Sequence, residues 1–130
     1  MVSAQTAKHE HHQEEPIQLN NGKKWKVHKN MIQYIRDMEK ETFDFEKRTK
    51  SFETINVAEY QVLGNILNAR IQLLTSNCTM TGQAHDELHK WLLPYIHSVE
   101  ELTAAKTASE AQNIFNQMKT SWKTFNTYFQ

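Results

Sequence analysis

Apolar residues at helical spacing dominate the chain from residue 27 onward and limit what it can fold into. In four segments, apolar side chains recur every three or four residues, which places them on one face of an α-helix. Three glycines and two prolines in 130 residues argue against a turn-rich β fold. The pattern therefore predicts an all-α protein with helices over about Val27 to Arg48, Asn56 to Leu74, Thr81 to Leu102 and Thr107 to Phe129.

The connections between these segments are short. Loops of about 3 to 8 residues between helices of about 20 favour antiparallel neighbours. We therefore expect an up-down-up-down antiparallel four-helix bundle over residues 25–130. Asn56 and Thr107, each followed three residues later by a glutamate, have the spacing of N-caps. Pro94 lies inside the third segment and is expected to kink that helix or split off its first turns.

Residues 1–24 are polar and lack a periodic pattern, which predicts a disordered arm. The arm contains the run His9–Glu10–His11–His12, which could collect metal weakly or be a solvated tail. The stretch Val2 to Gln5, "VSAQ", resembles the end of a cleaved secretory signal. We therefore expect a periplasmic or otherwise exported protein.

Charge and hydropathy exclude two classes of partner. Fifteen basic residues balance fifteen acidic ones, so no basic field favours nucleic acid. Trp25, Trp91 and Trp122 lack the basic surroundings of a nucleic-acid stacking platform and are expected in the core or at its rim. No apolar stretch approaches the roughly 20 residues that span a bilayer, so we expect no membrane span.

The last segment, "SEAQNIFNQMKTSWKTFNTYF", carries the short motifs "EAQ" (110–112) and "QMKT" (117–120). It resembles the closing helix of the small periplasmic b-type cytochromes, which are haem-binding four-helix bundles. The resemblance covers most of the chain and implies the same fold. It places Met31 where that family has its methionine haem ligand, and Asn126 where the family has its histidine ligand.

One stretch, "NCTMTGQAHDELHKW" (77–91), concentrates residues that bind soft metals. It holds the only cysteine, Cys78, then Met80, and then His85 and His89. Histidines four residues apart on a helix project from the same face and can bind one ion. Thiolate and thioether sulfur select Cu(I), whereas thiolate with imidazole also suits Zn²⁺. The cluster predicts a site for copper, with zinc as second choice.

The expected topology adds two candidates to this cluster. The start of the first helix, the end of the second and the start of the third should share one end of the bundle. His28 and Met31 would then lie near the cluster, as further metal ligands or, for Met31, as part of the core stripe.

The predicted function is sequestration or delivery of a soft transition metal, with a metal-transfer protein as a possible partner. Cys78 and His85 could also pair as nucleophile and base, but no third orienting residue accompanies them, so no enzyme activity is expected. Two alternatives stay open. One is a structural or protein-interaction bundle that binds no metal. The other is a haem-binding bundle with altered ligation, for instance by Met31 with His85 or His28.

Overall fold

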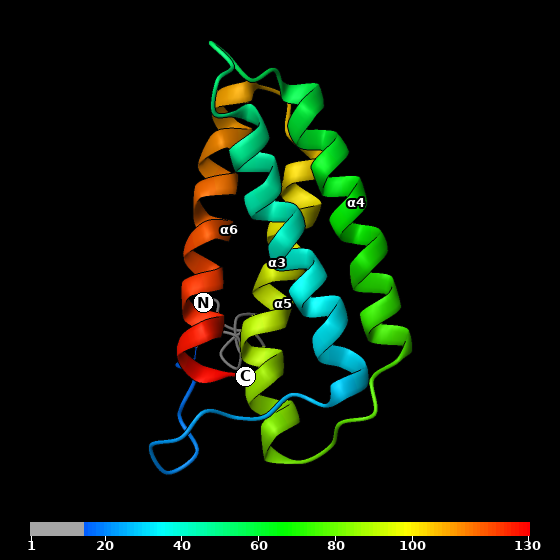
Figure 1. Cartoon of the computed structure of the whole chain (residues 1–130), viewed down its shortest axis with the longest axis vertical. Coiled ribbons are helices and arrows are strands. Elements are labelled where there is room, and N and C mark those ends of the chain that lie inside the picture. The colour runs from blue at the N-terminus through cyan, green and yellow to red at the C-terminus, as the bar shows by residue number, and fades with distance from the viewer. Residues whose placement is uncertain (1–14) are drawn as a thin grey trace, which may run out of the picture.

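The computed structural model describes residues 15–130, which form four helices (Figure 1). They are α3 (Lys29–Thr49), α4 (Val57–Ser76), α5 (Gln83–Ala104) and α6 (Ala108–Tyr128). The prediction of a four-helix all-α fold is confirmed. In Figure 1, each helix runs in the opposite direction to the helix before it. No helix in the described part of the chain is long and apolar enough to cross a membrane.

Side-chain caps fix the starts of two helices, as the sequence predicts. At the start of α4, the Asn56 side-chain oxygen accepts a hydrogen bond from the backbone N–H of Ala58 at 3.2 Å. At the start of α6, the Thr107 hydroxyl accepts one from the backbone N–H of Glu110 at 3.1 Å. Each cap pairs a backbone donor that the helix itself leaves unpaired.

The segment before α3 is extended and pairs with the C-terminus. The backbone N–H of Trp25 donates to the carbonyl of Tyr128 at 2.8 Å, and that of Val27 donates to Gln130 at 2.8 Å. Gln130 donates back to the carbonyl of Trp25 at 2.9 Å. The predicted helix start at Val27 is therefore wrong by two residues, because this pairing holds Val27 extended and α3 begins at Lys29.

Residues 15–24 were expected to belong to the disordered arm, but they are attached to the helices. The backbone N–H of Gln18 donates to the Glu87 carboxylate at 2.9 Å, and the Trp25 indole donates to the Gln18 carbonyl at 2.6 Å. Asn20 and Lys23 close a turn through two backbone hydrogen bonds. These contacts satisfy polar groups of the segment. The prediction that residues 15–24 are disordered is therefore wrong.

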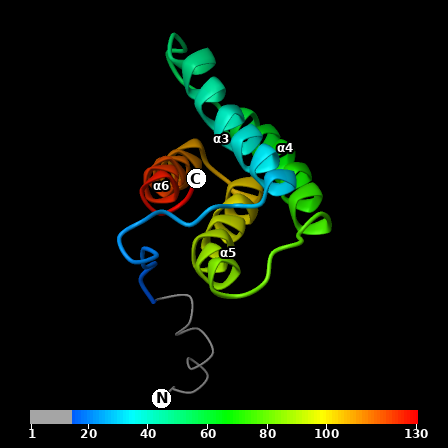
Figure 2. The ribbon, with the colours of Figure 1, turned by 60° about the horizontal axis from the view of Figure 1, so that its bottom comes forward.

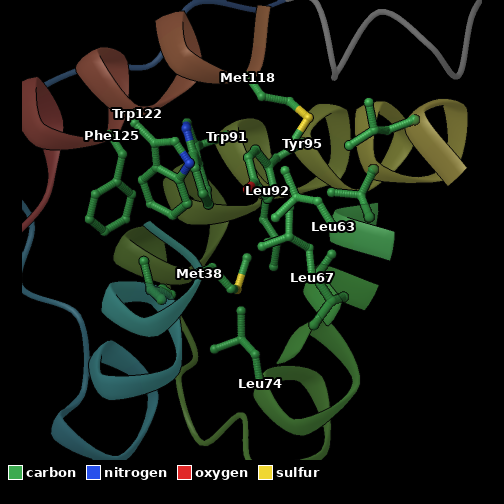
Figure 3. Packing of buried hydrophobic residues seen from close by; sticks show 14 of the residues in the cluster. Met38, Leu63, Leu67, Leu74, Trp91, Leu92, Tyr95, Met118, Trp122 and Phe125 are labelled. Atoms are coloured by element: carbon green, nitrogen blue, oxygen red, sulfur yellow. The ribbon is translucent and has the colours of Figure 1, made fainter. Parts of the chain in front are cut away.

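A cluster of aromatic rings from α5 and α6 forms part of the core (Figure 3). The Trp91 ring lies 4.9 Å from those of Tyr95, Trp122 and Phe125, measured between centroids. All three tryptophans of the chain are buried, as predicted. Burying a large apolar side chain stabilises a fold by roughly 1.5–3 kcal/mol, so this cluster is a major source of stability.

Pro94 does not split the third helix. α5 continues from Gln83 to Ala104 with Pro94 inside it. The proline is exposed, whereas Trp91, Leu92 and Tyr95 on either side are buried in the core. Packing of that buried face outweighs the one backbone hydrogen bond that proline removes.

Candidate metal-binding site

The connection between α4 and α5 lies against the start of α3. The Asn30 amide donates to the carbonyl of Asn77 at 2.7 Å. The Thr79 hydroxyl lies 2.9 Å from His28 Nδ1 and donates to the Asn30 side-chain oxygen at 3.3 Å. The three chain segments expected to share one end of the molecule therefore meet there. Figure 2 brings this end forward.

A cavity of about 320 Å³ opens at this end between α3, α4 and α5. Four of the six predicted ligands line it: Met31, Cys78, His85 and His89. The remaining wall is almost entirely apolar and is formed by Leu74, Thr75, Leu88, Leu92, Leu93 and Ile96. Potential ligands thus come together from α3, from the α4–α5 connection and from α5.

His85 and His89 form the closest pair among the candidates. Their ring centroids are 4.1 Å apart with an interplanar angle of 55°, and both side chains are half-buried. Burial lowers the pKa of His89, and the neighbouring His85 lowers it further. A lowered pKa keeps the imidazole of His89 neutral, and the neutral ring is the form that binds a metal ion.

The two sulfur atoms of the cavity differ in exposure. Met31 is 1% exposed and belongs to the inner wall, whereas Cys78 is an exposed free thiol. Among residues 15–130, no group of three or more His, Cys, Asp or Glu side chains is arranged to hold a metal ion. Cys78 and the two histidines line the same cavity but do not form a ready-made set of three metal ligands.

Two predicted ligands lie outside this cavity. Met80 is 4% exposed and packs in the hydrophobic core. His28 is exposed, and its Nδ1 atom is engaged with Thr79. The structure thus brings four of the six candidates to one cavity and gives Met80 and His28 other contacts. The His9–His12 run and the stretch Val2 to Gln5 lie outside the described residues.

Sequence reasoning missed the residues that anchor the connection. Asn30 holds the first half of it through hydrogen bonds with Asn77 and Thr79. A polar residue in the first turn of a helix is common, so the sequence gives no signal for this role.

Asn126 is engaged in a polar network between α3 and α6. Its side-chain amide donates to the Glu39 carboxylate at 2.8 Å and to the carbonyl of Trp122 at 2.9 Å. Its oxygen accepts from Arg36 at 2.7 Å. The side chain that the sequence resemblance places at a haem-ligand position is therefore an amide whose hydrogen-bonding groups are already used.

The cavity combines two imidazoles, a buried thioether and an exposed thiol within an apolar wall. These donors suit soft and borderline metals, and a thioether favours copper over zinc. A comparison of the chain with known protein families, curated proteins and solved structures found no match.

Proposed function

We propose that this protein binds one Cu(I) ion in the cavity between α3, α4 and α5, with Zn²⁺ as the second choice of metal. The observation that supports the proposal is that Met31, Cys78, His85 and His89 line the same small cavity. Its apolar wall lowers the local dielectric and limits competition by water for the ligands. The protein is not an enzyme in this proposal but a carrier that sequesters or delivers the ion in an exported setting.

The four ligands have different roles in the proposed site. His85 and His89 supply neutral imidazole nitrogen from one face of α5, and Met31 supplies thioether sulfur from the inner wall. Cys78 loses its proton and closes the site from the exposed side. An exposed thiolate ligand is also the one that an incoming metal-transfer partner reaches first. His9–His12 would act as a weak collector of metal.

The structure narrows the proposed ligand set. Met80 packs in the core and His28 contacts Thr79, so we propose neither as a direct ligand. Substitutions of Met80 and His28 therefore supply control variants for the binding experiment.

An anaerobic Cu(I) titration of the full chain against a competing chromogenic chelator tests the proposal. We expect tight binding of one ion by the wild type, with affinity at least tenfold weaker in Cys78→Ser and in His85→Ala. The control variants Met80→Leu and His28→Ala should keep most of the affinity. Because a ligand that binds only the folded state raises stability by mass action, Cu(I) should also raise the thermal midpoint of the wild type. Equal affinities of wild type, Cys78→Ser and His85→Ala would overturn the proposal.

A second candidate function is docking of a partner protein on α4. Val62, Ile66 and Leu73 are 55%, 36% and 43% exposed and lie along the outer side of that helix. Exposed apolar side chains grouped in this way are typical of interaction surfaces. Stability unaffected by any metal, together with self-association or partner binding lost in Ile66→Ser, would favour this function. A Soret band after addition of haem would instead favour the haem-binding alternative.

A further inference from the structure

A second and larger cavity lies at the opposite end of the molecule from the candidate metal site. It is a cleft of about 860 Å³ between the C-terminal end of α3, the α3–α4 connection and the first half of α6. Small-molecule sites typically have volumes of roughly 300–1,000 Å³. The cleft thus has the size of a ligand site, and its lining indicates which chemistry it would accept.

The floor of the cleft consists of three buried aromatic rings, those of Phe45, Tyr60 and Phe115. The Phe45 centroid lies 5.3 Å from each of the other two, and Tyr60 lies 6.0 Å from Phe115. The rings come from α3, α4 and α6, so the floor joins three helices. Flat apolar surface of this kind favours stacking with another flat ring system.

The rim of the cleft carries lysines, and one of them already holds a carboxylate. Lys47 and Lys50 reach the cleft from α3 and its end, and Lys119 reaches it from α6. The Lys119 ammonium pairs with the Glu46 carboxylate at 2.5 Å and lies 5.6 Å from the centroid of the Phe115 ring. The cleft therefore places a carboxylate-binding cation directly beside its aromatic floor.

We propose that this cleft binds a flat aromatic acid. The ring system stacks on the floor, and the acid group takes the place of the Glu46 carboxylate at Lys119. The ion pair between Glu46 of α3 and Lys119 of α6 already spans the cleft at this point. This site is separate from the proposed metal site and does not depend on it.

Binding of 8-anilinonaphthalene-1-sulfonate, an aromatic acid whose fluorescence rises in apolar surroundings, tests the proposal. Lys119→Gln should weaken binding about threefold and Glu46→Gln should strengthen it by a similar factor, because Glu46 competes with the probe for the lysine. Both substitutions break the same ion pair, so loss of stability alone would change the affinity in the same direction. Neutral N-phenyl-1-naphthylamine, which lacks the acid group, should respond to neither substitution.

A second pair of variants locates the bound probe. Gln112, which lines the cleft from α6, is replaced by tryptophan to fill part of the space, and exposed Asn113 beside it serves as the matched control. We expect Gln112→Trp to weaken probe binding and Asn113→Trp to leave it unchanged, with the probe excited directly. No binding to the wild type, equal affinities of Lys119→Gln and Glu46→Gln, or full binding by Gln112→Trp would overturn the proposal.

Discussion

At Gly64, α4 packs tightly against Thr103 of α5, and replacing the glycine by alanine tests this packing. A Cβ atom at residue 64 would lie 2.4 Å from the Thr103 hydroxyl oxygen and 3.1 Å from the Thr103 backbone nitrogen. The hydroxyl donates to the carbonyl of Val99 at 3.0 Å, so turning it away breaks a hydrogen bond. The backbone nitrogen can move only if α4 and α5 separate slightly.

The expected change in the free energy of unfolding follows from one stabilising contribution and two destabilising ones. Alanine in place of glycine in a helix interior normally stabilises a protein by about 1 kcal/mol. Overpacking at a helix contact costs about 1–3 kcal/mol, and loss of the Thr103 hydrogen bond costs about 1 kcal/mol more. We therefore expect Gly64→Ala to lower the free energy of unfolding by about 1–3 kcal/mol. The thermal midpoint should fall by roughly 4–12 °C.

Urea denaturation followed by circular dichroism and tryptophan fluorescence measures this change. Ala69→Gly, at an exposed position of the same helix, reports the local helix propensity and should cost about 1 kcal/mol. Adding Thr103→Ala to Gly64→Ala removes the clashing hydroxyl and should recover part of the loss. If Gly64→Ala were as stable as the wild type or more stable, the close contact between α4 and α5 would be refuted.

Three further substitutions test other parts of the fold. The Tyr95 hydroxyl is buried without a hydrogen-bond partner among the described residues, and burial raises its pKa to about 12. Tyr95→Phe should therefore change the free energy of unfolding by less than about 1 kcal/mol in urea denaturation. Burial and then His85 lower the pKa of His89. As the pH decreases below about 6.5, the unfolded chain therefore binds more protons than the folded chain, and the free energy of unfolding decreases. His89→Gln should flatten that slope in denaturation series at several pH values, and an unchanged slope would contradict the assignment. Phe129 is 1% exposed, so Phe129→Ala should cost about 3 kcal/mol and speed amide exchange at Trp25, which pairs with this segment.

Helical periodicity was sufficient to predict the four helices, because each buries a stripe of its own side chains. It could not predict where α3 begins, since the partners of Trp25 and Val27 lie at the far end of the chain. The same holds for residues 15–24, because Gln18 bonds Glu87, which is 69 positions away. Local patterns carry no signal for such pairings.

For the candidate metal site, the sequence predicted which side chains lie close together for four of the six candidates. The spacing of His85 and His89 on one helix sufficed to predict that their rings would lie together. Met31 and Met80 were both predicted as ligands, but only Met31 lines the cavity. A thioether is equally suited to a core and to a soft metal, so residue type alone does not separate these outcomes.

The candidate ligands fall into two groups according to what holds them in place. His85 and His89 are on α5 beside Leu88 and Leu92, which are buried in the core, so the histidine pair is fixed by the fold itself. Cys78 is on the α4–α5 connection, whose contacts with α3 include exposed hydrogen bonds that water can replace at little cost. In the proposed carrier, the fixed pair would favour binding of the ion, and the exposed thiol would allow its exchange with a partner. A site with all of its ligands buried in the core would hold copper but would release it slowly.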